Sequence, residues 1–344
     1  MTRNWLGAAA LSISITGAAM AEPTFTLLSF DDLDDWAADD HQAALTVFTE
    51  TCGDLKDPEW DGICAVAKTA PDARAFFEAF FQPVLIQDGA PMLFTGYFEP
   101  ELRGAPTQGG EYQYPIYRLP DDHVAGEPYL TRQEIEDGRP LAGRGLEIAW
   151  LADPVDLFFL QVQGSGRIRY PDGGGIRVGY GGKNGHEYSS IGRELIDRGI
   201  YDQHQVSAQV IRNWVRNNPD DGRDLLWVNK SYVFFREVNE VPADKGPLGA
   251  MNRSITTGRS IAVDPAFTAL GTPVWVEKEG ATPMHRLMVA QDTGSAIKGA
   301  QRADIFYGTG DAAGRKAGRI KDGGRMIRLL PIQMAYAMLP ETIE

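Results

Sequence analysis

The spacing of apolar residues predicts a helical start to the folded chain. Residues 39–51 open with acidic side chains and continue with helix-forming residues, so we expect a helix there, favoured by the acids near its start. In PDARAFFEAFFQPVLI the aromatic residues recur at i, i+1, i+4 and i+5, which predicts a buried helix face that ends before Pro83: Phe76, Phe77, Phe80 and Phe81. The segment PMLFTGYFEPEL (91–102) is rich in β-forming residues and predicts a strand closed by Pro100.

The amino-acid composition differs in the segment from about residue 104 to residue 241, which is rich in Gly, Arg and Asp. We expect long strands over 156–170 (DLFFLQVQGSGRIRY) and 223–238 (RDLLWVNKSYVFFREV). Two helices are predicted between them. One, in SSIGRELIDRG, has Ser189 or Ser190 as N-cap and Gly199 just past its end, and the other, in VSAQVIRNWVRNNP, stops at Pro219.

Short strands separated by glycine turns recur from residue 259 onward. They are SIAVDP, TPVWVE, HRLMVAQD, ADIFYG and MIRLLP. This pattern predicts a small β-barrel. The segment GTGDAAGRKAG predicts a short helix directly after the ADIFYG strand.

The first 21 residues have the pattern of a secretory signal peptide. Arg3 is followed by an apolar run and by the small-x-small sequence Ala19-Met20-Ala21. The run is too short for a membrane span, and no cysteine for a lipid anchor stands at the cleavage point. We therefore expect an exported protein, periplasmic or associated with the outer membrane, without a transmembrane segment.

Composition narrows the class of protein. The remaining chain of about 320 residues suits roughly two domains, and 43% hydrophobic residues are enough to fill a sizeable core. Removal of Arg3 with the leader changes the formal charge from −14 to −15, which argues against nucleic acid and anionic membrane surfaces as partners.

The two cysteines, Cys52 and Cys64, are close in sequence in an exported chain, which favours a disulfide over two separate thiols. A metal site is not expected, because the histidines are scattered without ligand spacing: His41, His123, His186, His204 and His285.

Common catalytic motifs are missing from the sequence. Gly164-Ser165-Gly166 lacks the spacing of a nucleophile elbow, and no phosphate loop or dinucleotide fingerprint occurs. No cofactor is expected. Carboxylates remain as candidates: Asp264 and Asp292 each follow a strand and suit turn bracing, whereas Asp304 stands in the apolar stretch Ala-Asp-Ile-Phe. An apolar setting raises the pKa of a carboxyl group, which suits a general acid.

Five separated motifs in order resemble the membrane-bound lytic murein transglycosylase A family: FTGYFEPEL, LQVQGSGRI, NKSYVFFRE, AVDPAFTALGTPVWVE and AQDTGSAIKGAQRADIFYGTG. The resemblance implies a mainly β fold with some helices. It implies a double-psi β-barrel domain (22–104 plus 244–344, with the N-terminal helices) and an inserted, β-rich, substrate-binding domain (105–243), with a groove between them.

The resemblance also implies an activity and a site. Members of the family are carbon–oxygen lyases that act on peptidoglycan. They cleave the β-1,4 bond between N-acetylmuramic acid and N-acetylglucosamine and leave a 1,6-anhydro ring on the N-acetylmuramic acid. The family's catalytic aspartate falls on Asp304, with Asp292 beside it in a supporting role. Further residues are expected to contact the glycan strand: Thr95, Tyr97, Glu99, Gln161, Gln163, Ser165 and Asp264.

A single aspartate is sufficient in principle, because the C6 hydroxyl of the sugar is the nucleophile and one group can donate a proton and then accept one. Two alternatives remain open at this point. The chain is a noncatalytic polysaccharide-binding or wall-loosening barrel, or it is a two-carboxylate glycoside hydrolase that uses Asp292 and Asp304.

Overall fold

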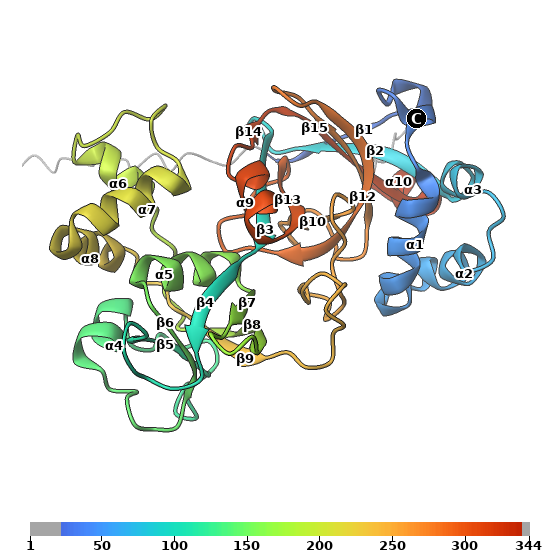
Figure 1. Ribbon diagram of the computed structural model, residues 1–344. Helices are drawn as coiled ribbons and strands as arrows, with labels where there is room; N and C mark the ends of the chain where they lie inside the picture. The colour runs from blue at the N-terminus through green and yellow to red at the C-terminus, as the bar shows by residue number, and fades with distance from the viewer. Residues whose placement is uncertain (1–21, 339–344) are drawn as a thin grey trace, which may run out of the picture.

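The computed structural model describes residues 22–338 and contains two separate sheets, each with helices packed around it (Figure 1). The predicted signal peptide, residues 1–21, lies outside the described residues. No helix within residues 22–338 has both the length and the apolarity needed to span a bilayer.

The larger sheet has nine strands in the order β1-β2-β15-β11-β12-β10-β13-β3-β14. Their bounds are β1 Thr24–Leu27, β2 Phe81–Gln87, β3 Leu93–Glu99, β10 Ser260–Val263, β11 Pro273–Lys278, β12 Met284–Thr293, β13 Arg302–Thr309, β14 Lys321–Asp322 and β15 Gly324–Pro331. The pairs β10–β12 and β13–β3 are parallel and the other pairs are antiparallel. All five short strands predicted after residue 259 are present. Their ladders form an open series from β1 to β14, so closure into a double-psi barrel stays a prediction.

Three helices pack on one side of this sheet: α1 His41–Thr51, α2 Pro58–Ala67 and α3 Ala73–Phe80. They bury an aromatic cluster against Trp275 and Leu287. The helix predicted over 39–51 begins two residues later, because Asp40 caps it by accepting from the Ala43 amide.

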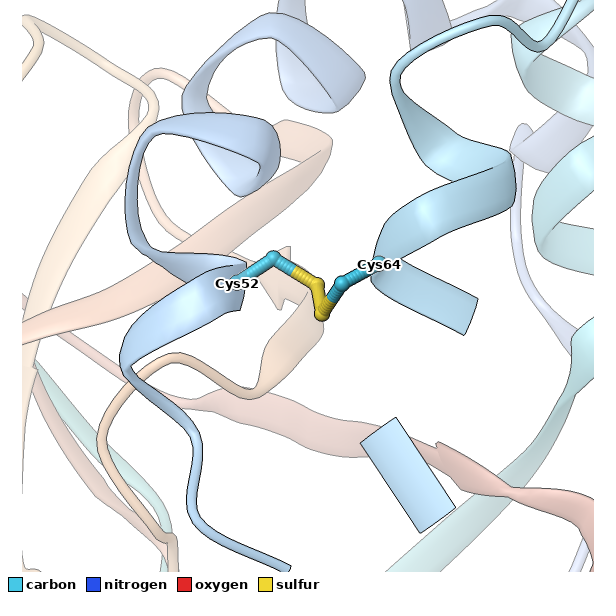
Figure 2. Close-up of a disulfide and its surroundings, with 2 residues drawn as sticks. All are labelled: Cys52 and Cys64. Carbon is cyan, nitrogen blue, oxygen red and sulfur yellow. A yellow bond between two sulfur atoms is a disulfide. The ribbon is translucent and has the colours of Figure 1, made fainter. Parts of the chain in front are cut away.

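Three of the four phenylalanines lie on α3 as predicted, with Phe76 and Phe77 buried and Phe80 partly buried. Phe81 starts β2, where it is still buried in the same cluster. Cys52 and Cys64 are joined by a disulfide between the end of α1 and helix α2, with their Cα atoms 5.5 Å apart (Figure 2).

The smaller sheet has six strands in the order β5-β6-β4-β7-β8-β9. Their bounds are β4 Glu101–Ala105, β5 Tyr114–Tyr117, β6 Glu147–Leu151, β7 Gly166–Arg169, β8 Gly175–Lys183 and β9 Val233–Glu237. The helices of this part are α4 Arg132–Gly138, α5 Pro154–Gln163, α6 Ile191–Asp197, α7 Ala208–Asn217 and α8 Pro219–Val228. Strand β4 continues from β3 across Pro100, so one extended segment joins the two sheets (Figure 1).

Two predicted strands are wrong over part of their length. Residues 156–163 belong to helix α5, which starts at the Asp153 cap and Pro154, and only β7 is extended. Likewise residues 223–228 complete α8, and the extended part is β9. In both segments β-forming apolar residues are buried on a helix, so composition alone misassigns them.

The remaining helix predictions are confirmed. Ser190 is the N-cap of α6, and its hydroxyl accepts from the Arg193 amide. Helix α7 ends before Pro219, which is the first residue of α8. Helix α9 (Gly310–Ala317) directly follows β13, and α10 (Ile332–Ala337) follows β15.

Candidate active site

Asp304 lies on β13, on the face of the sheet opposite the larger sheet's central core. Its neighbours Ala303 and Ile305 are fully buried in that core together with Ile261. Because side chains alternate along a strand, Asp304 and Phe306 point to the other face. The sequence placed Asp304 among apolar neighbours, but Ala303 and Ile305 point into the core, away from its carboxylate.

Four residues in register across neighbouring strands form what we call the Asp304 row. Ala262 on β10 is paired with Asp292 on β12 and with Asp304 on β13, and Asp304 is paired with Thr95 on β3. The two carboxylates thus stand two strands apart, which corresponds to about 10 Å between Cα atoms. Residues in register share a face of the sheet, so the row presents both carboxyl groups on one side.

Asp304 is partly exposed and has one short hydrogen bond. The Thr95 hydroxyl donates to Oδ1 of Asp304 at 2.7 Å, and Nη2 of Arg302 donates to the Thr95 oxygen at 2.8 Å. Among the described residues no group donates to Oδ2. Removal from water raises the pKa of Asp304 to about 6, against the lowering effect of the Thr95 hydrogen bond and the Arg302 charge.

Asp292 is held by more hydrogen bonds than Asp304. Its Oδ1 accepts from the Ala250 and Thr293 amides at 3.0 and 2.9 Å, and its Oδ2 accepts from the Tyr97 hydroxyl at 2.9 Å. Burial raises the pKa of Asp292 to about 6, and the nearby charge of Asp304 adds to the increase, although the three hydrogen bonds oppose it. Both carboxyl groups therefore titrate closer to neutrality than an ordinary aspartate.

Tyr97 connects the ends of the row. Its ring packs against Phe306 with centroids 5.3 Å apart, and its hydroxyl reaches Asp292. Burial, followed by the charges of Asp292 and Asp304, raises the pKa of Tyr97 well above its usual value. The phenol stays protonated and acts as a donor.

Glu99 is fully buried and bonded on all sides. Its carboxylate accepts from Arg167 at 2.9 Å, from Arg177 at 2.8 Å and from the Thr309 hydroxyl at 2.8 Å. The arginines lie on β7 and β8 of the smaller sheet, whereas Glu99 and Thr309 lie in the larger sheet. In this structure Glu99 joins the two sheets and has no exposed surface for a glycan.

Gln161 and Gln163 fall within the strand predicted over 156–170, but they lie on helix α5 instead. Gln161 is buried and accepts from Arg132, and Gln163 accepts from the Phe98 amide at 2.9 Å. The strand predicted for these two residues is therefore wrong, although Gln163 does contact β3. Ser165, just past the helix, is buried at 7% exposure.

Asp264 braces a turn. Its carboxylate accepts from the Gly299 amide at 2.9 Å and from the Ala266 amide at 3.2 Å, while the Lys298 amine lies 3.8 Å away. These bonds tie the end of β10 to the segment that leads into β13, so Asp264 positions the approach to Asp304.

Two contributors to the site were not predicted. Arg302 lies two residues before Asp304 on the same strand face, and strand alternation alone would have identified it. The Ala250 amide comes from the segment between β9 and β10, for which the sequence carries no pattern. Residues 22–338 contain no cluster of three or more His, Cys, Asp or Glu side chains placed to bind a metal ion.

The arrangement suits proton transfer. Asp304 has a raised pKa, partial access to solvent, one oxygen fixed by Thr95 and a second oxygen that accepts no hydrogen bond from residues 22–338. A carboxyl group of this kind is able to donate a proton and then to accept one from a bound molecule.

Comparison with known families divides the chain into two matched parts. Residues 93–236 match the family described as the MltA specific insert domain, and residues 259–330 match the family described as the 3D domain. The first match contains the six strands of the smaller sheet, and the second contains Asp264, Asp292 and Asp304.

Curated relatives agree with these matches. A Vibrio cholerae protein named membrane-bound lytic murein transglycosylase A is 36% identical over 267 residues, which cover 73% of this chain and 69% of the relative. The protein of the same name from Escherichia coli strain K12 is 39% identical over 241 residues, which cover 68% of this chain and 64% of the relative.

Solved structures share the fold. A membrane-bound lytic murein transglycosylase from Agrobacterium tumefaciens has a TM-score of 0.83 at 33% identity, covering 91% of this chain and 99% of that chain. E. coli MltA with bound chitohexaose has a TM-score of 0.71 at 29% identity, covering 89% and 94%. The chain belongs to the membrane-bound lytic murein transglycosylase A family.

Proposed function

We propose that this chain is a peptidoglycan lytic transglycosylase in which Asp304 is the single acid and base. It cleaves the β-1,4 bond between N-acetylmuramic acid and N-acetylglucosamine and leaves 1,6-anhydro-N-acetylmuramic acid ends. The relatives named lytic murein transglycosylase A support the class of enzyme. The observation that carries the assignment is the environment of Asp304, whose pKa is raised to about 6 and whose Oδ2 accepts no hydrogen bond from the part of the chain that the structure describes.

The reaction needs no second carboxylate. Protonated Asp304 donates its proton to the glycosidic oxygen as the bond from C1 to that oxygen breaks. The resulting carboxylate then accepts the proton of the C6 hydroxyl while the C6 oxygen bonds to C1. Atoms balance without water, and the intramolecular nucleophile supplies the proximity that an external water lacks.

The neighbours of Asp304 have supporting roles in this proposal. Thr95, held by Arg302, orients one carboxylate oxygen so that the other faces the sugar. Asp292, fixed by Tyr97, places a second carboxyl group on the same face, and its negative charge favours an oxocarbenium-like transition state.

The two parts of the chain have different roles as well. Residues 22–104 and 244–344 form the catalytic double-psi barrel domain, and residues 105–243 form the domain that binds the glycan strand across a groove. We assign Gln163, which contacts β3, and the largely buried Ser165 to the inserted-domain wall of this groove, while Glu99 and Gln161 act as braces behind it. The protein is exported through its leader and acts in the periplasm or at the outer membrane.

One competing function has a specific observation in its favour. The Asp304 row holds Asp292 on the same face, and inverting glycosidases keep their two carboxyl groups roughly 6.5–9.5 Å apart. A two-carboxylate hydrolase would add water to the glycan. A noncatalytic polysaccharide-binding barrel would not cleave it at all.

Product masses distinguish the three functions. Purified sacculi are digested with the full-length protein, and the released muropeptides are analysed by mass spectrometry. We expect anhydro ends, which are one water lighter than hydrated ends. Hydrated ends would assign the hydrolase, and intact sacculi would assign the binding protein.

A further inference from the structure

A cavity in the smaller-sheet part of the chain lies apart from the Asp304 row. It has a volume of about 610 Å³ and is lined by residues of β5, β6, α4, α5 and α8, which gather in one region (Figure 1). None of the residues assigned to the active site lines it. The volume falls within the range of about 300–1,000 Å³ that small-molecule sites occupy.

Aromatic side chains form much of the cavity wall. Five of them come from four segments of the inserted part: Tyr114 and Tyr117 on β5, Trp150 on β6, Trp227 on α8, and Tyr232 just before β9. Tyr114 is 37% exposed at the rim, whereas Tyr117 and Tyr232 are buried at the base. Tyrosine and tryptophan pair an apolar ring with a polar atom, which suits a ligand that has both an apolar face and hydroxyl groups.

Several polar groups at the cavity are fixed by the protein. Glu136 accepts from Arg132 and from the Trp227 indole, both at 2.9 Å. The Arg223 guanidinium stacks on the Trp227 ring at 5.0 Å from its centroid. Trp227 is therefore held on both its edge and its face, and the ring is preorganised before any ligand arrives.

The charge around the cavity is balanced. Four acidic side chains line it together with three arginines, of which Arg139 has no carboxylate within 4 Å among residues 22–338. Arg132, buried beneath the wall and paired with Glu136, supplies the fourth cation. Because these charges nearly cancel, the cavity does not favour a strongly charged ligand. Its fixed aromatic rings and polar rim suit an uncharged sugar.

We propose that this cavity is a second saccharide site, which binds a short stretch of β-1,4-linked N-acetylated amino sugar. The choice of saccharide rests on the proposed function, because a chain that cleaves peptidoglycan meets such sugars in its substrate. The site holds a glycan strand away from the Asp304 row and keeps the enzyme on its substrate between cleavage events.

The test uses the full-length protein labelled with 5-fluorotryptophan and triacetylchitotriose as probe. Resonances are assigned with Trp150→Phe and Trp227→Phe. We expect the probe to shift the ¹⁹F signals of Trp150 and Trp227 and to leave that of Trp275 unchanged, because Trp275 is buried in the larger sheet.

A matched pair of variants locates the binding. Tyr114→Ala removes an aromatic ring at the cavity rim and is expected to weaken probe binding at least about fivefold, since a lost contact of roughly 1 kcal/mol has that effect. Tyr336→Ala removes an exposed tyrosine from α10 and is expected to leave binding unchanged.

The outcomes separate this inference from the proposed function. Unmoved signals of Trp150 and Trp227 at saturating probe would overturn the second site, as would a probe affinity that is unchanged in Tyr114→Ala. Shifts produced only by a peptide stem fragment would assign the cavity to peptide and also overturn the proposal. Digestion of sacculi by the same preparation reports on the catalytic function independently of these signals.

Discussion

At the residue scale, Asp304 is governed by two opposing effects. Burial raises its pKa, while the Thr95 hydroxyl and the Arg302 charge lower it, and the balance lies at about 6. A group acting first as an acid needs its proton, so turnover on sacculi is expected to fall as pH rises above about 6. A buffer series from pH 4.5 to 8.5 measures this limb.

Replacement of Asp304 by Asn is expected to abolish cleavage, because the amide neither donates an acidic proton nor accepts one. The loss should be at least the ~10²–10⁴-fold typical of a general acid or base. Asp61→Asn, the same change at an exposed position on α2, is the control and should retain full activity. Near-normal turnover of Asp304→Asn on sacculi would contradict the assignment.

The same substitution has a pH-dependent effect on stability. The folded-state pKa of Asp304 lies above the unfolded value, so its contribution to stability is present below about pH 3.8 and is lost as pH rises through about 6. Asp304→Asn should therefore raise the free energy of unfolding at pH 8, by at most about 3 kcal/mol, and the gain should vanish near pH 4. Urea unfolding at the two pH values measures the difference, and an equal gain at both would contradict it.

Asp292→Asn is expected to weaken cleavage without abolishing it. The amide keeps one acceptor oxygen where Asp292 uses two, and it removes a negative charge from the Asp304 row, so an oxocarbenium-like transition state should be stabilised less. Product masses should still show anhydro ends. If this variant is folded and as inactive as Asp304→Asn, then Asp292 is a full catalytic partner.

At the element scale, the sequence pattern predicted the short strands after residue 259, but it did not predict a helix that is buried on most of its surface. The strands after residue 259 were predicted because short apolar runs end at glycine turns. Helix α5 was missed because it is buried nearly all round, from Val155 to Gln161, so its apolar residues show no helical period. The Asp153 cap and the left-handed Gly164 that bound it were present as signals.

The sequence likewise predicted part of the candidate active site and missed another part. Asp292, Asp304, Thr95 and Tyr97 do lie together, since they come from strands whose motifs were recognised. The burial of Glu99 and Gln161 was not foreseen, because their arginine partners are distant in sequence and only the tertiary fold brings them together.

Helix α9 packs closely on β3 at Gly96. A Cβ atom on Gly96 would lie 2.8 Å from Cα of Ala317 and 2.9 Å from the Tyr307 ring. Gly96→Ala is expected to cost about 1–3 kcal/mol of unfolding free energy because helix or strand must shift. It should also lower activity, since Gly96 adjoins Thr95. Gly62→Ala on α2, where a Cβ meets nothing within 4 Å, is the control and should be neutral or stabilising. Equal stability of the two variants under urea would show that the contact relaxes freely.

At the scale of the whole molecule, Glu99 is the electrostatic link between the sheets. Glu99→Gln leaves Arg167 and Arg177 without a buried partner charge and is expected to destabilise by about 3–5 kcal/mol. Glu101→Gln is the comparison, because its pair with Arg169 is largely exposed and should contribute at most about 1 kcal/mol. Calorimetric unfolding of both variants measures the contrast, and similar losses would mean that the sheets are held by other contacts.

The order of synthesis along the chain determines when the site around Asp304 can form. Thr95 and Asp304 are 209 residues apart, and β3 pairs with β13 only after the entire smaller-sheet part has been synthesised. Contacts of such separation form late in folding, so a growing or truncated chain that stops before Arg302 has neither the carboxylate nor the strand that orients its partner hydroxyl. The chain therefore cannot cleave peptidoglycan while it is being translated, because the active site forms only when the last strands have been made and paired.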